Sequence, residues 1–224
     1  MIHRVVRTTA LAALLVPLPA ALTAQNPPPT QAQAGVQAQA PLPPLPPNGW
    51  RIDRAHSGVT FRVRHLGISW VNGVFNDWTA ELVYDPAHPE NASVTARIQV
   101  TSISTSNERR DNDLRSGRFF AADSFPELSF TSRSVQRAGE GRLRITGDLT
   151  MHGVTRPVTL DVEASAVQSG QRGRRVAFTA TVTVDRKEWG MTFSPLAEGI
   201  RTAGDEVRIT IDLEAVQPVA PAGS

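Results

Sequence analysis

Hydrophobic and polar residues alternate strictly along residues 142–164, on both sides of a short break at His152-Gly153. A period of two residues is typical of a β-strand with one apolar and one polar face. A glycine-bearing break between two such runs indicates an antiparallel hairpin. Because a hairpin cannot bury its apolar face alone, the pattern predicts a larger antiparallel sheet. The residues of the apolar face are Leu143, Ile145, Gly147, Leu149, Met151, Val158, Leu160, Val162 and Ala164.

Six further segments show the same alternation, and one segment between them does not. The alternating segments are 57–66, 74–84, 92–103, 127–136, 174–187 and 206–216. Residues 107–120 are instead dense in charge. Asn107 can cap a helix there, and Leu114 with Phe119 or Phe120 forms a thin apolar stripe, so we expect a short helix. Eight amphipathic strands and one short helix predict an all-β domain.

We expect these strands to form a closed antiparallel sheet. Closure removes the exposed sheet edges, and eight strands leave room for packed side chains or for one small ligand. The pattern therefore predicts an eight-stranded antiparallel β-barrel. A two-sheet sandwich explains the same alternation and is the structural alternative.

The two ends of the chain differ in composition from this domain. Residues 1–24 have a positive start and a short apolar run, which indicates a cleaved secretory signal. Residues 25–49 are rich in Pro, Gln and Ala and predict a disordered spacer. Residues 217–224 are expected to be a disordered tail. The barrel domain then spans residues 50–216, and the mature protein is expected to be periplasmic or secreted, without a membrane anchor.

Composition excludes several classes of partner and site. The chain has 23 basic and 21 acidic residues. Removal of Arg4 and Arg7 with the signal would leave 21 of each, which argues against nucleic acid as a partner because phosphate binding needs a basic surplus. The chain has no cysteine, so disulfides, thiolate chemistry and cysteine metal sites are excluded. Apolar residues make up 40% of the chain, which is enough for a hydrophobic core.

The polar residues Asp53, His56 and Ser57 resemble the members of a hydrolase triad. A triad needs converging side chains, normally from separate loops, and the chain has no nucleophile-elbow motif. We therefore interpret these residues as a polar turn that fixes the entry of a strand, and we assign no catalytic residue. We also assign no metal site, because the histidines of the mature chain show no paired helical spacing. They are His56, His65, His88 and His152.

An ordered set of motifs covers residues 50–216. The motifs include Trp50-Arg51-Ile52-Asp53, Phe61-x-Val63-x-His65-Leu66-Gly67, Arg110-Asp111, Leu114-Arg115-Ser116, Thr146-Gly147-Asp148-Leu149-Thr150 and Ile211-Asp212-Leu213-Glu214-Ala215. By these motifs the chain resembles the YceI-like, polyisoprenoid-binding, lipocalin-like family. The resemblance implies an extended eight-stranded antiparallel barrel that is secreted to the periplasm, is often dimeric, and holds an isoprenoid, an isoprenoid quinone or a related long-chain amphiphile. It implies no other cofactor. The long proline-rich spacer departs from the family, as does Trp189 where the family more often has Phe before Gly.

The inward faces of the strands are expected to line an apolar cavity for one lipid chain. His65 continues the inward phase of its strand; it is either hydrogen-bonded in the core or placed near the mouth, where it meets a ligand head group. Small inward residues leave space: Ala80, Ala96, Gly147, Ala164 and Ala180. The predicted cavity residues are Phe61, Val63, His65, Leu82, Ile98, Phe130, Ile145, Leu149, Leu160, Phe178, Val182, Trp189, Ile209 and Ile211.

The sequence therefore predicts a secreted lipid-binding barrel that is not an enzyme. Each buried methylene contributes roughly 0.8 kcal/mol, so each isoprene unit contributes on the order of 4 kcal/mol. A few units outweigh an association cost of about 4–15 kcal/mol. Two alternatives are a solid-core structural or interaction barrel without a ligand and a lipid-modifying enzyme.

Overall fold

The computed structural model describes residues 43–171, 173–197 and 199–218. The predicted signal and most of the predicted spacer lie outside the described residues, as do the last six residues of the predicted tail. Two of the predicted boundaries shift. Gly49 is buried and begins the first strand, and Gln217 is the last residue of the final strand.

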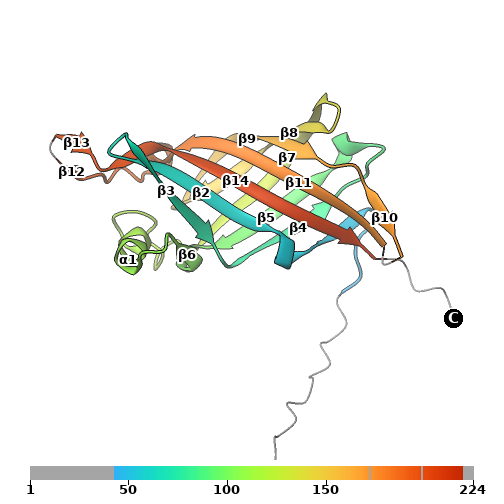
Figure 1. Cartoon of the computed structure of the whole chain (residues 1–224), viewed down its shortest axis with the longest axis horizontal. Helices are drawn as coiled ribbons and strands as arrows, with labels where there is room; N and C mark the ends of the chain where they lie inside the picture. Colours follow the sequence, from blue (N-terminus) through green and yellow to red (C-terminus); the bar gives the residue numbers. More distant parts are fainter. Residues whose placement is uncertain (1–42, 172, 198, 219–224) are drawn as a thin grey trace, which may run out of the picture. The chain divides into compact units, whose positions relative to one another are not determined.

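Strands make up most of the described chain, with one α-helix and four short 3-10 turns (Figure 1). In chain order the elements are β1 (Gly49–Ile52), η1 (Arg54–His56), β2 (Gly58–His65), β3 (Ser69–Phe75), β4 (Trp78–Val83), η2 (Pro89–Asn91), β5 (Ser93–Gln99), η3 (Val100–Ser102), β6 (Ile103–Ser104), α1 (Glu108–Arg115), β7 (Glu127–Gly139), β8 (Arg142–Met151), β9 (Val154–Ala164), β10 (Gln168–Gly170), β11 (Gly173–Asp185), η4 (Arg186–Trp189), β12 (Leu196–Ala197), β13 (Ile200–Arg201) and β14 (Ala203–Gln217).

The strands close into an antiparallel barrel, as the alternation predicts. Its hydrogen-bonded order is β11-β9-β8-β7-β5-β4-β1-β14, and the ring closes because β14 also pairs with β11. That closing ladder is long and runs from Arg174↔Gln217 to Asp185↔Glu206. The eight-stranded barrel with one helix is therefore confirmed, and the sandwich alternative is wrong.

Three wall positions of the barrel are each built from two strands. Both β1 and β2 pair with β14, and the 3-10 turn η1 separates them. In the same way, β4 pairs with β1 while β3 pairs with β2, so β4 and β3 together form the next position around the wall. One position further, β5 pairs with β4 and β6 pairs with β3. The predicted strand 74–84 is thus two strands, of which β3 begins earlier, at Ser69. A tight turn allows this early start, because Leu66 and Gly67 both adopt positive φ, 51° and 75°.

The barrel wall has two interruptions toward its α1 end. The pairing of β9 with β11 runs from Phe178↔Ala164 only to Thr181↔Asp161, although β11 continues to Asp185. The pairing of β5 with β7 ends at Gln99↔Glu127, and in the described part of the chain β6 pairs only with β3. We call these two interruptions the seams of the barrel.

Helix α1 lies beside the second seam, within the predicted helical segment. Its start is capped as predicted, because the Asn107 side chain accepts a hydrogen bond of 3.0 Å from the Arg110 amide. The helix ends at Arg115, since Ser116 has an extended backbone. Residues 116–120 are therefore not helical, and turns hold them instead.

Two glycines on the inward face of the wall let aromatic rings lie against the backbone. A Cβ atom on Gly73 would lie 2.2 Å from the Phe61 ring, and one on Gly147 would lie 2.5 Å from the Phe130 ring. Any larger residue at either position would displace the ring. The space that we expected beside Gly147 is therefore filled by Phe130.

Candidate functional site

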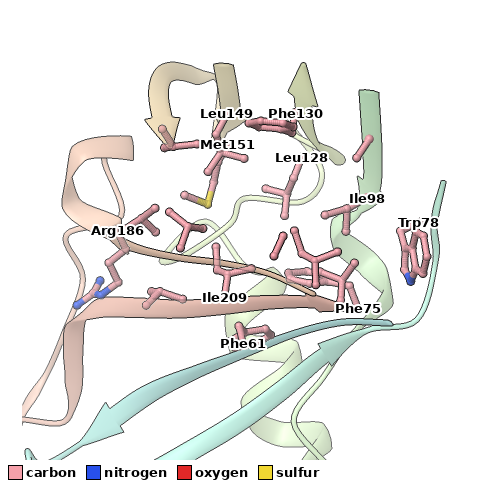
Figure 2. Close-up of a pocket in the computed structure, with 18 of the residues that line it drawn as sticks. Phe61, Phe75, Trp78, Ile98, Leu128, Phe130, Leu149, Met151, Arg186 and Ile209 are labelled. Atoms are coloured by element: carbon pink, nitrogen blue, oxygen red, sulfur yellow. The ribbon is translucent and has the colours of Figure 1, made fainter. Parts of the chain in front are cut away.

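The barrel encloses an apolar cavity of about 420 Å3, lined by side chains from β2, β3, β4, β5, β7, β8, β9, β11 and β14. Figure 2 shows Leu128, Phe130, Leu149 and Ile209 converging on this space from different strands. The volume lies in the usual range for sites that take small molecules, roughly 300–1,000 Å3. An interior of this kind is a binding space rather than a fully packed core.

Thirteen of the fourteen predicted cavity residues line this space. Their inward phase follows from the strand alternation, and the closed ring brings together side chains that lie far apart in the sequence. That they contact a ligand stays a prediction. The thirteen are Phe61, Val63, His65, Leu82, Ile98, Phe130, Ile145, Leu149, Leu160, Phe178, Val182, Ile209 and Ile211.

Trp189 is the predicted cavity residue that the structure places elsewhere. It lies on η4, after β11 has separated from β9, and only 1% of its surface is exposed. Its indole nitrogen donates to the Leu149 carbonyl at 3.1 Å, and its own carbonyl lies 3.0 Å from Nδ1 of His152. Trp189 thus packs at the seam between β9 and β11, because it lies in a 3-10 turn beyond the predicted strand 174–187.

His65 lies at the end of β2, where it both lines the cavity and is exposed to solvent. Its Nδ1 lies 2.9 Å from the Thr202 carbonyl. It is therefore not a core histidine. Its position marks the mouth of the cavity, at the α1 end of the barrel.

Aromatic residues from two segments meet across this mouth. Phe119 follows α1, and Phe193 lies in the segment between η4 and β12. Their ring centroids are 5.4 Å apart in an edge-to-face arrangement, and the Arg118 guanidinium lies over the Phe193 ring. Both phenylalanines line the cavity. Side chains, rather than strands, therefore bound this end of the cavity.

Arg186 is a buried cation at the mouth that we did not predict. It is 4% exposed, and it donates to the carbonyls of Met191, Phe193 and Gly204 and to the Asp205 carboxylate. Burial lowers the pKa of Arg186, while Asp205 acts in the opposite direction. The sequence could have indicated that Arg186 is buried, because this residue continues the inward-facing alternation of β11. An arginine on an apolar face needs several buried acceptors.

The opposite end of the cavity is closed by stacked aromatic side chains. Trp50 donates from its indole nitrogen to the Tyr84 carbonyl at 2.8 Å. Tyr84 packs edge-to-face on Phe178, with ring centroids 4.9 Å apart. Burial raises the pKa of Tyr84. The cavity therefore has one apolar, closed end and one end rimmed by polar groups.

Comparison with known proteins places this fold in a family. The model for the family described as YceI-like domain matches residues 50–215. The chain belongs to the YceI-like family. The resemblance seen in the sequence motifs is thereby confirmed.

Relatives of this YceI-like chain include proteins of known sequence and of known structure. A UPF0312 protein of Shewanella sp. strain ANA-3 is 41% identical over 145 residues, 62% of this chain and 75% of that protein. The Campylobacter jejuni YceI protein has a solved structure with a TM-score of 0.61 and 29% identity, covering 75% of this chain and 96% of that chain. A polyisoprenoid binding domain from Saccharophagus degradans has a TM-score of 0.55 and 13% identity, covering 77% and 100%, which shows a shared fold.

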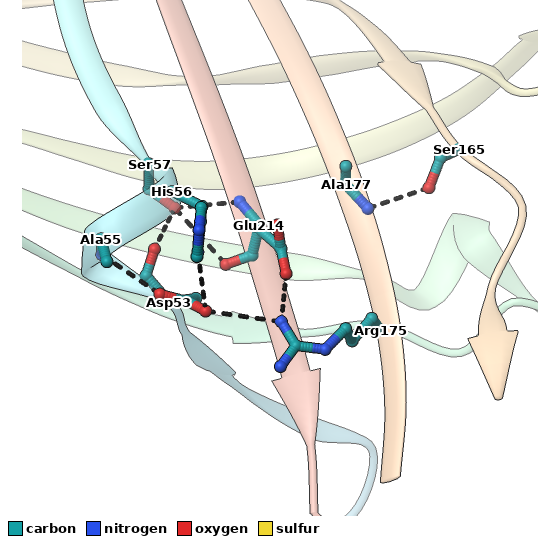
Figure 3. Close-up of polar contacts among 8 residues, drawn as sticks. All are labelled: Asp53, Ala55, His56, Ser57, Ser165, Arg175, Ala177 and Glu214. Carbon is teal, nitrogen blue, oxygen red and sulfur yellow. Dashed lines mark hydrogen bonds and ion pairs between the residues drawn. The ribbon is translucent and has the colours of Figure 1, made fainter. Parts of the chain in front are cut away.

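The polar turn of this YceI-like barrel lies between β1 and β2, outside the cavity (Figure 3). The Ser57 hydroxyl donates to the Asp53 carbonyl at 2.7 Å and accepts from the Glu214 amide at 2.9 Å. His56 pairs with the Asp53 carboxylate at 3.1 Å. Because the serine hydroxyl bonds to backbone groups and not to the histidine, these residues do not form a triad. Their hydrogen bonds link the turn between β1 and β2 to β14.

Asp53, His56 and Glu214 also bring three potential ligand atoms within 4.8 Å of one another. Arg175 forms ion pairs with both carboxylates of this cluster. The Arg175 guanidinium, from β11, therefore supplies positive charge to the Asp53 and Glu214 carboxylates. We assign the cluster a structural role, joining β11, β14 and the start of β2.

The first testable prediction concerns the pH dependence of this cluster. The hydrogen bond with His56 is the largest influence on Asp53 and holds its pKa below the ordinary value of 3.8. A carboxyl whose pKa is lower in the folded state adds stability above its unfolded pKa and loses that contribution as pH falls through its folded pKa. We expect Asp53→Asn to lower the Tm at pH 6, and we expect this Tm difference to shrink as the pH is lowered below 3.8. Calorimetry across this range checks it, and a Tm difference that is independent of pH would contradict it.

No helix among the described residues is both long enough and apolar enough to cross a bilayer.

Proposed function

We propose that this YceI-like chain is a non-enzymatic binding protein that carries an isoprenoid, an isoprenoid quinone or a similar long-chain amphiphile in its barrel. We place it in the periplasm or outside the cell, because of the predicted signal in residues 1–24.

The observation that carries this proposal is the apolar cavity with a single polar end. Its walls between Tyr84 and the mouth are aliphatic and aromatic, and the polar lining residues gather near His65, Arg110 and Arg186. Such a space gains free energy from burying a hydrocarbon tail, roughly 0.8 kcal/mol per methylene. It offers few groups that distinguish one tail from another. Affinity should therefore depend mainly on tail length.

The related Saccharophagus degradans domain is described as polyisoprenoid binding, and its likeness to this chain supports the proposal at the level of fold. The two alternatives from the sequence receive less support. A solid barrel would not enclose about 420 Å3 of apolar space. Covalent catalysis on a lipid ester would need an activated nucleophile, and the best sequence candidate, Ser57, is engaged with backbone groups outside the cavity.

A titration with quinones of increasing isoprenoid length tests the proposal. On delipidated protein we expect affinity to rise with each isoprene unit until the cavity is full and then to level off, with smaller effects from head-group changes. Quenching of the intrinsic tryptophan fluorescence, or calorimetry, measures the affinity. Absence of binding at every length, together with an unchanged Tm, would contradict the lipid-carrier function and favour the ligand-free barrel.

A further inference from the structure

Three arginines surround one tryptophan on the outer face of the barrel, beside the cavity mouth. Arg62 and Arg64 lie on β2, Arg208 on β14 and Trp70 on β3. The guanidinium carbons lie 4.7, 4.1 and 4.9 Å from the Trp70 ring centroid. We call these four residues the arginine–tryptophan face. It results from register, since Arg62 is the cross-strand neighbour of Arg208, and Arg64 of Trp70.

This face carries positive charge that the protein does not neutralise. Among the described residues, no ion pair joins Arg62, Arg64 or Arg208 to a carboxylate within 4.0 Å. Like charges directly opposite each other on neighbouring strands are unfavourable. On the outer faces of β5, β7 and β8 the arrangement is different, because each of the following arginines pairs with an acid: Arg97, Arg133, Arg142 and Arg144.

Large exposed hydrophobic residues occur at the same end. Ile68, in the turn between β2 and β3, is 79% exposed, and Leu196, on β12, is 67% exposed. Both flank the mouth: Ile68 follows His65 by three residues, and Leu196 follows Pro195, which lines the cavity. Val74, on the outward side of β3, is a third exposed apolar residue, at 37%. A surface that enters a membrane interface typically combines exposed aliphatic side chains with arginines and a half-buried tryptophan, as found here.

We propose that the mouth end of the barrel docks on an anionic lipid bilayer. The three arginines contact lipid phosphates, Trp70 lies at the level of the head groups, and Ile68 and Leu196 enter the acyl boundary. Docking in this orientation would place the cavity mouth against the bilayer in which long apolar chains dissolve. The biological purpose of this contact rests on the lipid-carrier function proposed above, but the contact itself can be measured separately.

Vesicle binding tests the proposal, with vesicles of phosphatidylcholine alone or with about one third phosphatidylglycerol. We expect sedimentation of the full chain with the anionic vesicles only, and weaker binding as salt is raised. Each arginine near an anionic surface contributes about a fivefold factor in affinity, so Arg62→Gln, Arg64→Gln and Arg208→Gln together should weaken binding on the order of a hundredfold. Ile68→Ser should also weaken it, without a change in Tm because the side chain is exposed.

A matched variant and a spectroscopic signal make the test specific. Arg133→Gln, Arg142→Gln and Arg144→Gln remove the same charge from another face and should leave vesicle binding unchanged. Trp50, Trp78 and Trp189 are at most 4% exposed, so a blue shift of fluorescence on vesicle binding reports Trp70. The shift should vanish in Trp70→Phe.

Three results would overturn the docking proposal. They are equal binding of the wild-type chain to neutral and anionic vesicles, equal losses in the two arginine variants, and a dimer that dissociates on loss of the arginine–tryptophan face while vesicle binding is unchanged. The last result would identify a second copy of the chain as the occupant of this face. Quinone titration of the arginine variant without vesicles separates the two proposals. Retained quinone binding with lost docking in that variant supports both proposals. In the wild-type chain, vesicle docking without any quinone binding contradicts only the carrier function.

Discussion

Replacing Ile145 with aspartate is expected to unfold the barrel or to destabilise it by several kcal/mol. Ile145 lies on β8 between Val135 and Leu160 of the neighbouring strands, and 9% of its surface is exposed. It belongs to the core cluster at the β1 end of the barrel. An aspartate there would place a charge among apolar side chains. Urea denaturation followed by circular dichroism measures the loss.

The neighbouring residue provides the control. Arg144 points outward, is 63% exposed, and has only a long ion pair of 3.5 Å with Asp161. An exposed pair of this kind contributes about 0–1 kcal/mol, so Arg144→Asp should cost about 1 kcal/mol or little more, including repulsion from Asp161. Similar losses in the two variants would mean that the two faces of β8 have been assigned incorrectly.

Filling the cavity from two opposite walls is expected to abolish binding of the longest lipid chains while the fold is retained. Ala180 on β11 and Ala96 on β5 both line the cavity, and four steps around the ring separate their strands. Phenylalanine at both positions would occupy space otherwise open to a ligand tail. Loss of room for one isoprene unit corresponds to roughly 4 kcal/mol, about a thousandfold in affinity.

Ala177 gives a matched control for this variant. It lies on the same strand as Ala180 but is exposed on the outer face, opposite Glu214. Ala177→Phe should leave the affinity for long quinones unchanged. Titration of delipidated protein with a short and a long quinone distinguishes the outcomes. A double cavity variant that binds both quinones as tightly as the wild type would show that the tail lies elsewhere.

Alternation predicted the barrel wall well, because it depends only on which face of each strand is dry. Ile145 and Phe178 line the cavity for this reason, although 33 residues separate them in the sequence. Trp189 was misplaced because it lies beyond the predicted strand 174–187, in a 3-10 turn where alternation does not tell which way a side chain points. Such a turn depends on tertiary contacts, here with Leu149 and His152.

The mouth was harder to predict than the wall. Arg186 was missed because its acceptors are carbonyls of residues 191, 193 and 204, which periodicity does not bring together. The arginine–tryptophan face was missed for a related reason. Arg62 and Arg64 share an obvious outward phase, but only the pairing of β2 with both β3 and β14 brings Trp70 and Arg208 beside them.

The two seams give the barrel unequal resistance to opening. At the β1 end, widening the wall would break main-chain hydrogen bonds. Where β9 has separated from β11, and where β6 has no strand on its far side in the described chain, side chains such as Trp189 and the segment around α1 close the wall. Parting these requires loss of packing but not of a ladder. Amide deuterium exchange should therefore be slowest in β8 and fastest at the seams. If the barrel carries a lipid as proposed, its tail would have a sideways route through a wall that stays folded.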